Sequence, residues 1–86
     1  QGEIDIVALQ GENLVFVEVK TRRTIDYGHP FEAIDARKKR RMGGLAHAWA
    51  VAHPLHARGR RIRLDVVGIV GHDPSSGSLE HVADLV

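Results

Sequence analysis

The chain contains no cysteine, only three prolines and few aromatic residues: one tryptophan, one tyrosine and two phenylalanines. Without cysteine it can form neither disulfide bonds nor thiolate metal sites, a composition that suits a reducing compartment, and we predict a cytoplasmic location. No stretch approaches the roughly 20 consecutive apolar residues that a membrane-spanning helix needs. We therefore expect no membrane partner.

Several familiar functional signatures are also missing. The sequence has no Walker-type lysine motif, no serine-triad signature, no dinucleotide fingerprint and no internal repeat. Its 86 residues, 43% of them hydrophobic, are enough for one small globular domain, so we predict that residues 1–86 form a single domain. The net charge of +1 says little about partners.

The most informative feature is an acidic residue in one strand-like run, followed by an acid–lysine pair near the end of the next run. That pair is Glu18 and Lys20, within the run L-V-F-V-E-V-K. Because side chains alternate across a strand, Glu18 and Lys20 share one face. Between the runs, Gly-Glu at positions 11 and 12 fits a two-residue type II′ turn. That turn would set Asp5 opposite Glu18 and Glu3 opposite Lys20.

Two opposed carboxylates repel each other unless a cation lies between them. Cβ atoms of directly opposed residues are only about 4.5–5.5 Å apart, and a hard divalent cation prefers oxygen ligands. An ordinary half-exposed strand shows the same alternation, and Glu3 opposite Lys20 would then be a surface ion pair of small energy. The spacing alone leaves both interpretations open.

Five segments, taken in order, resemble the YraN family, a largely uncharacterised bacterial family. The segments are G-E-I-D-I-V-A from Gly2, L-V-F-V-E-V-K-T-R from Leu14, Y-G-H-P from Tyr27, E-A-I from Glu32 with Lys38 and Arg41, and R-L-D-V-V from Arg63. The resemblance implies a restriction-endonuclease-like fold related to Holliday-junction resolvases of the PD-(D/E)xK superfamily. Members of the family begin with a helix and a further strand, which this sequence lacks, so we expect it to be an N-terminally truncated form.

The order of elements predicts an α/β fold, with a small mixed β-sheet and a helix packed against it. A strand–helix–strand order implies a right-handed crossover that makes its two strands parallel. The helix would then begin near the Lys20 end of the preceding strand. The predicted elements are strands Glu3–Leu9, Leu14–Arg22 and Arg61–Val70, a loop Thr24–Pro30, a helix from Phe31 or Asp35 to His53, and a final strand or helical turn Leu79–Val86.

Basic residues gather around positions 22–23, 37–41 and 58–63, as a protein that binds a phosphate backbone would need. Ordinary solvated charges are the alternative for each cluster. Helical periodicity gives an apolar stripe, and Lys38 falls in its middle, so we predict that Lys38 points toward the sheet. It would either snorkel to the sheet edge or reach phosphate beside Glu18. The stripe comprises Ile34, Met42, Leu45, Trp49 and Ala52.

Other polar residues have simpler interpretations. For Asp65, an ion pair with Arg63 is preferred to a metal-binding role, because both side chains would face the same side of a strand. His53 and His56 lack the additional ligands of a structural zinc site. The pair of glycines at positions 43 and 44 indicates a kink or a close backbone approach within the helix.

We therefore predict a metal-dependent nuclease that cleaves DNA, with Asp5, Glu18 and Lys20 as its catalytic residues. Asp5 and Glu18, with Glu3, would bind Mg²⁺ or Mn²⁺. By the resemblance the substrate would be DNA, with branched DNA as one form. A nucleic-acid-binding or protein-interaction module without catalysis is the alternative, and a homodimer through the exposed sheet edge is a further expectation. The residues expected to hold the nucleic acid are Arg22, Arg23, Lys38 and Arg41.

Overall fold

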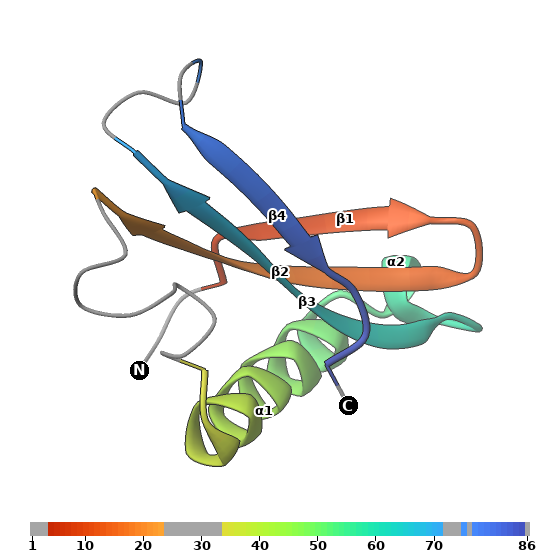
Figure 1. The fold of residues 1–86 in the computed structure, drawn as a ribbon. Coiled ribbons are helices and arrows are strands. Elements are labelled where there is room, and N and C mark those ends of the chain that lie inside the picture. Colours follow the sequence, from red (N-terminus) through yellow and green to blue (C-terminus); the bar gives the residue numbers. More distant parts are fainter. Residues whose placement is uncertain (1–3, 24–33, 72–74, 76, 86) are drawn as a thin grey trace.

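The computed structural model describes residues 4–23, 34–71, 75 and 77–85, which form four strands and two helices (Figure 1). The predicted loop Thr24–Pro30 lies outside the described residues. The elements in chain order are β1 (Ile6–Gln10), β2 (Asn13–Arg22), α1 (Ala36–Ala52), α2 (Pro54–Ala57), β3 (Arg61–Val70) and β4 (Ser78–Val82).

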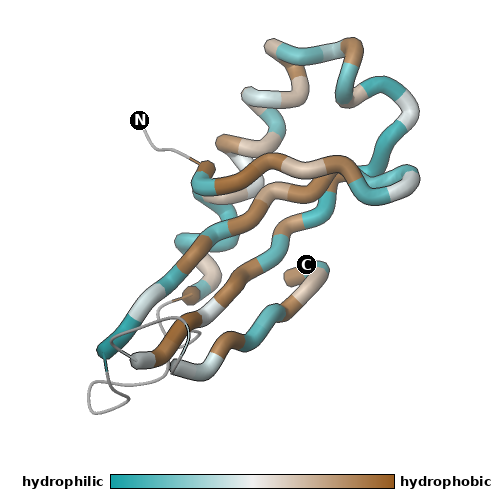
Figure 2. Tube along the Cα trace, turned by 90° about the horizontal axis from the view of Figure 1, so that it is seen from above, coloured by the Kyte–Doolittle hydropathy of each residue, from teal (hydrophilic) through white to brown (hydrophobic). Residues whose placement is uncertain are grey.

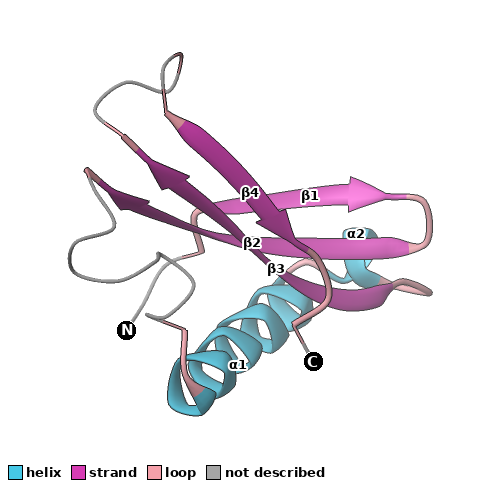
Figure 3. Ribbon diagram, viewed as in Figure 1, coloured by secondary structure: helices cyan, strands magenta, loops and turns pink. Residues whose placement is uncertain are grey.

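The four strands form one sheet in the order β1-β2-β3-β4 (Figure 3). β1 and β2 are antiparallel, β2 and β3 are parallel, and β3 and β4 are antiparallel. This confirms the predicted α/β fold with a small mixed sheet. The C-terminal segment, for which the sequence left two possibilities, is strand β4.

The hairpin between β1 and β2 has the predicted register. Val7 pairs with Phe16, and Gln10 pairs with Asn13 across a two-residue turn. Gly11 has a φ of 58° and Glu12 has no positive φ, which is the sign pattern of a type II′ turn. This turn therefore fixes which residues of β2 share a face with which residues of β1.

Helix α1 begins and ends as the capping signals predict. The carboxylate of Asp35, the N-cap residue, accepts a 2.9 Å hydrogen bond from the backbone N–H of Lys38. That hydrogen bond lowers the pKa of Asp35. The helix ends before His53, and Pro54 opens the short helix α2.

The core lies between α1 and one face of the sheet. Leu14 and Phe16 of β2 are fully buried, and Trp49 packs edge to face on Phe16 with ring centroids 5.7 Å apart. Apolar positions recur along the neighbouring strands in Figure 2. The expectation for Ala52 was wrong, because Ala52 is exposed, and Ala46 is buried instead. The buried cluster comprises Leu14, Phe16, Met42, Ala46 and Leu64.

The opposite face of the sheet is also apolar, but within the described residues no helix covers it (Figure 1). Val15 and Val17 of β2 are buried there, whereas Ile6, the β1 partner of Val17, is 47% exposed. Ile4, two residues before Ile6, packs against the helix-side core instead. The chain bends at Asp5, which separates the two isoleucines.

Gly43 and Gly44 have no close neighbours. A Cβ atom built on either glycine would meet no atom within 4 Å outside its own helical surroundings. The predicted close backbone approach at these positions is therefore wrong.

Candidate functional site

Glu18 and Lys20 form an ion pair near the C-terminal end of β2. Lys20 Nζ lies 3.0 Å from Glu18 Oε2, and the two side chains are 22% and 18% exposed respectively. Strand alternation places both residues on the face of Phe16, which is the face covered by α1. The pair is thus partly screened from water and lies beyond the apolar core.

The Asp5 carboxylate lies beside the same strand, just before β1 begins. Its Oδ2 atom accepts a 2.8 Å hydrogen bond from the backbone N–H of Val19, the residue between Glu18 and Lys20. The β1–β2 ladder ends at the Ile6–Val17 pair, so the predicted opposition of Asp5 and Glu18 continues the register but lies outside the ladder. Glu3, predicted opposite Lys20, lies outside the described residues.

The geometry of β2 adds a third oxygen at this position. In a strand, the backbone N–H and C=O of one residue point toward the same edge of the strand. This is why two opposed residues of an antiparallel pair can form two hydrogen bonds with each other. The Val19 N–H points toward Asp5, so the Val19 carbonyl faces that edge as well. Among the described residues, no three His, Asp or Glu side chains lie together so as to hold a metal. A cation here would therefore rest on two carboxylates, one backbone carbonyl and non-protein ligands.

A second feature is a hollow of about 390 Å³ at the N-terminal end of α1. It is lined by Asp35, Arg37, Lys38 and Arg41. Lys38 is half-buried, whereas Lys39 and the arginines beside it are exposed. Lys38 therefore differs in burial from its basic neighbours, while its predicted direction toward the sheet stays a prediction. The structure thus brings Lys38 and Arg41 together in one basic hollow.

Arg22 and Arg23 are not part of that hollow. The Arg22 guanidinium donates a 2.9 Å hydrogen bond to the carbonyl of Thr21, and Arg23 is exposed just after β2. The hollow is lined by Lys38 and Arg41, whereas Arg22 and Arg23 lie at the C-terminal end of β2 and do not line it. The predicted backbone-binding residues therefore fall into two separate groups.

Asp65 lies on the opposite face and is fully buried. Arg63 donates two hydrogen bonds to its carboxylate, at 3.0 and 2.9 Å, which confirms the predicted ion pair. His81 Nε2 lies 2.7 Å from Asp65 Oδ2, and the backbone N–H of Asp84 donates to Asp65 Oδ1 at 3.1 Å. No local pattern predicts the roles of His81 or Asp84, because the pairing of β4 with β3 brings them to Asp65.

The electrostatics of Asp65 follow from these contacts. Burial by itself disfavours the charged carboxylate, but the hydrogen bonds from Arg63, the Asp84 amide and His81 outweigh it and lower the pKa of Asp65. The same contact raises the pKa of Arg63. With its oxygens already engaged by protein donors, Asp65 is a structural residue.

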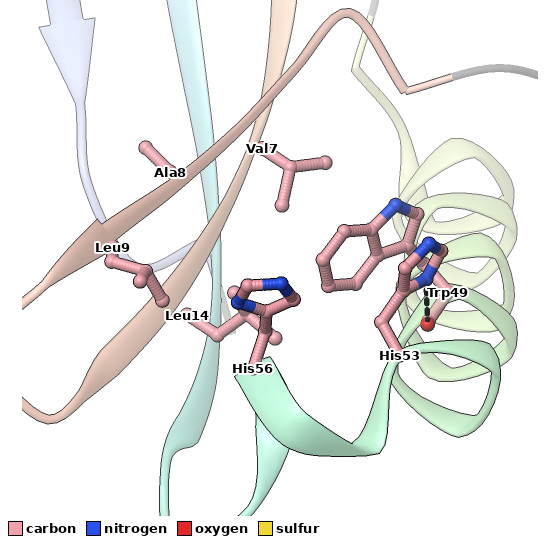
Figure 4. Close-up of a pocket in the computed structure, with 7 residues that line it drawn as sticks. All are labelled: Val7, Ala8, Leu9, Leu14, Trp49, His53 and His56. Atoms are coloured by element: carbon pink, nitrogen blue, oxygen red, sulfur yellow. Dashed lines mark hydrogen bonds between the residues drawn. The ribbon is translucent and has the colours of Figure 1, made fainter.

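A further cavity, of about 270 Å³, opens between β1 and the C-terminal end of α1 (Figure 4). The ring of His53 stacks on Trp49 at 3.9 Å, and His53 Nδ1 lies 2.9 Å from the Trp49 carbonyl oxygen. In the described residues no third ligand joins His53 and His56 to form a metal site. The lining residues are Val7, Ala8, Leu9, Leu14, Trp49, His53 and His56.

The mixed four-stranded sheet, with α1 packed against Leu14 and Phe16 of β2, defines a small α/β domain that fits a nuclease-like core. The chain belongs to the uncharacterised protein family UPF0102, whose sequence profile matches residues 1–69. The resemblance to the YraN family is therefore confirmed.

Three relatives illustrate the match. A UPF0102 protein of Paenarthrobacter aurescens (strain TC1) is 51% identical over 94% of this chain and 65% of its own length. Relatives from Arthrobacter sp. (strain FB24) and Rhodococcus opacus (strain B4) are 46% and 48% identical, over 95% and 96% of this chain and 68% and 69% of their own lengths. The chain thus spans about two thirds of the length of these relatives. As for membranes, none of the helices in the described residues is long and apolar enough to cross one.

Proposed function

We propose that the protein is a metal-dependent nuclease that hydrolyses phosphodiester bonds of DNA in the cytoplasm. The observation that carries the proposal is the 3.0 Å ion pair of Glu18 and Lys20. The residue between them, Val19, donates its backbone N–H to the Asp5 carboxylate. The Asp5 carboxylate thus lies beside the strand that carries the Glu18–Lys20 pair. The absence of cysteine supports the reducing compartment.

The residues present fit Mg²⁺ or Mn²⁺. Mg²⁺ is usually held by one or two carboxylates, and retains several waters and substrate phosphate oxygens as further ligands. Among the described residues, the hydrogen bond of Asp5 and the ion pair of Glu18 each use a single carboxylate oxygen, Oδ2 and Oε2, which leaves the second oxygen of each as a candidate ligand within this part of the chain. Glu3, predicted as a third acidic ligand, remains part of the proposal.

Each side chain has a distinct task in the proposed reaction. When bound, the divalent ion polarises the phosphodiester and lowers the pKa of an attacking water. Asp5 and Glu18 hold negative charge at a fixed position on the sheet, and the amide of Val19 orients the Asp5 carboxylate. Lys20, a compact ammonium, orients the water or offsets charge that develops on the phosphorus.

The two basic groups would hold the DNA backbone. Lys38 and Arg41 line the hollow at the start of α1, where the positive end of the helix dipole also favours phosphate. Arg22 and Arg23 would contact the backbone beyond the end of β2. Such contacts position a nucleic acid without reading its sequence, which agrees with a substrate chosen by shape, as branched DNA is.

A second candidate is a nucleic-acid-binding or protein-interaction module without catalysis. The observation that favours it is that Asp5 and Glu18 are already engaged, by the Val19 amide and by Lys20. A fold of this kind does not by itself confer activity. The two candidates differ in whether removal of a carboxylate abolishes turnover or only changes binding.

The test is a cleavage assay with Mn²⁺ on linear and branched DNA, applied to this chain and to the longer Paenarthrobacter aurescens relative. Asp5→Ala should abolish cleavage but leave binding to DNA in place, whereas Glu12→Ala, in the exposed hairpin turn, should change neither. Binding without cleavage in both proteins would favour the second candidate. Cleavage that survives Asp5→Ala would exclude the proposed site.

We also propose that β1 pairs with a second copy of the chain. In the described residues no strand lies next to its outer edge, and the segment I-V-A-L-Q carries no charge that would prevent pairing. Ile6 and Leu9 are about half exposed, at 47% and 52%. Light scattering should show a dimer that Ile6→Lys converts to monomer. A monomer at high protein concentration would contradict the proposal.

A further inference from the structure

We propose that the cavity between β1 and the C-terminal end of α1 binds a nucleobase from a single-stranded segment of the nucleic acid. The inference rests on the proposed function, since it concerns the same nucleic acid. It assigns a role to residues that the cleavage site does not use, namely Trp49, His53 and His56.

The cavity has the size and walls of a pocket for a flat ring. It encloses about 270 Å³, and its apolar walls come from Val7 and Leu9 of β1 and from Leu14 of β2. Figure 4 shows Val7 pointing toward the Trp49 ring, whereas Ala8 points away from it. Trp49 is only partly buried, so its ring remains accessible from the cavity.

Three aromatic rings gather at this position. His53 stacks on Trp49 with an interplanar angle of 16°, and the His56 ring lies 6.3 Å from Trp49 at a tilt of 40°. From the sequence, Trp49 belongs to the apolar stripe of the helix, and a single aromatic on such a stripe is usually a core residue. The structure adds two histidine rings and an open cavity, which is the arrangement that binds bases without sequence preference.

Charge at the rim favours a polyanion. None of the seven lining residues is acidic. The Arg60 guanidinium donates a 2.8 Å hydrogen bond to the carbonyl of His56, and exposed Arg58 follows α2 directly. A base in the pocket would therefore have cationic side chains next to its phosphates.

The pocket also lies on the side of the sheet that carries the cleavage site. Leu14 and Glu18 are on the same face of β2, four residues apart, which corresponds to roughly 13 Å of strand. The part of this face between them is covered by α1, so the nucleic acid would pass outside that buried core. A base that has left the duplex near the cleavage site would then enter the pocket from the β1 side.

Trp49 provides a direct readout because it is the only tryptophan in the chain. The experiment titrates the protein with single-stranded oligothymidylate in EDTA, so that no metal is bound and no cleavage occurs, and follows tryptophan emission. The control ligand is an abasic oligonucleotide of the same length and charge. We expect oligothymidylate to quench the emission and the abasic ligand to leave it unchanged.

A matched pair of variants locates the contact. His56→Ala removes a lining residue, whereas His47→Ala removes an exposed histidine of α1 that does not line the cavity. We expect His56→Ala to weaken oligothymidylate binding between about fivefold and a hundredfold, which is the range measured for loss of one stacked aromatic. His47→Ala should bind like the parent chain. Thermal melting of both variants checks that they fold.

The outcomes separate this inference from the proposed function. Equal quenching by the abasic ligand, or equal affinity of the two variants, would overturn the base pocket and leave cleavage at Asp5 and Glu18 untouched. Base-dependent quenching in a protein that cleaves no DNA would support the pocket and reject the nuclease. Binding without any change in emission would also overturn the pocket.

Discussion

Asp65 and Glu18 are both acidic residues next to a basic partner, on adjacent parallel strands but on opposite faces of the sheet. Asp65 is fully buried, and its carboxylate receives hydrogen bonds from Arg63 and the Asp84 amide and a contact from His81. Glu18 is partly exposed, with one described ion pair, to Lys20. A carboxylate whose two oxygens both accept hydrogen bonds from the protein stabilises the packing of the strands. A carboxylate with fewer protein partners can bind a ligand.

The comparison shows why the charge pattern alone is a poor guide to function. In sequence, R-L-D and E-V-K are both an acid and a base two residues apart on one face of a strand. They differ in what the rest of the fold brings to them. β4 and the residues after it close over Asp65, whereas in the described residues the β1–β2 ladder stops at Ile6 and Val17, where β1 begins, one residue short of Glu18.

Glu18→Gln should have the largest effect, and the effect should be on activity. We expect loss of DNA cleavage by at least about a hundredfold, because a ligand of the proposed metal and the partner of Lys20 are removed together. The melting temperature should change little, since the pair is partly exposed. Cleavage rates and thermal melts of Glu18→Gln and Glu12→Gln test this. A strongly destabilised Glu18→Gln would make Glu18 a structural residue like Asp65.

Asp65→Asn should show the opposite pattern. Replacing one partner of a buried ion pair typically costs about 3 kcal/mol of unfolding free energy, because Arg63 is left without its counter-charge. Asp84→Asn is the matched control: the Arg61–Asp84 ion pair is exposed, and the backbone amide that Asp65 uses is retained. Urea unfolding of both variants measures the difference. Equal, small effects would mean that the Asp65 contacts contribute little.

The same contacts predict a loss of stability in acid. The pKa of Asp65 is lower in the folded chain than its usual value of 3.8, so the folded state binds the proton more weakly than the unfolded state does. The stabilisation is therefore complete well above pH 3.8 and decreases as the pH falls through the folded-state pKa. Urea unfolding at a series of pH values should show this decrease. The decrease should be smaller in Asp65→Asn, and an identical pH profile in the two proteins would contradict the assignment.

Lys38 and Lys39 offer a smaller and more selective comparison. Lys38 is half-buried in the basic hollow, whereas Lys39 is exposed. Lys38→Ala should therefore weaken DNA binding more than Lys39→Ala does, and all binding should weaken steeply with added salt. Binding titrations at several salt concentrations test both statements. Equal effects would reduce Lys38 to one charge among several.

Gly44→Ala should have the smallest effect, a gain in stability. Gly44 is exposed inside α1, and an added Cβ would meet no atom within 4 Å. Alanine is more favourable than glycine in a helix by about 0.8–1 kcal/mol, so the melting temperature should rise slightly. A decrease would indicate a contact at this position that the fold does not explain.

The sequence predicted most elements of the fold, because their signals are local. Gly11, which has a positive φ, defined the turn and hence the hairpin register. Asp35 caps α1 because its short carboxylate can accept a hydrogen bond from the backbone N–H three residues later. The Glu18–Lys20 pair was predictable for the same reason, since both residues belong to one strand. Such features need only residues close in sequence.

What the sequence could not predict depends on how the elements dock. Helical periodicity defined an apolar stripe, but the rotation of α1 against the sheet decided that Ala46 is buried and Ala52 exposed. His81 reaches Asp65 only through the pairing of β3 with β4. The cavity beside Trp49 needs β1, α1 and α2 in their final positions. No local pattern encodes these arrangements.

The two edges of the sheet have one further consequence, for the stoichiometry of assembly. β1 presents an uncharged edge, whereas β4 carries Glu80 and His81, and charged side chains are a common device against edge pairing. A molecule in which one sheet edge can pair with another strand forms a dimer about a two-fold axis. No further copy can then add to that dimer. Assembly of this chain should therefore be finite, and it should not extend into filaments.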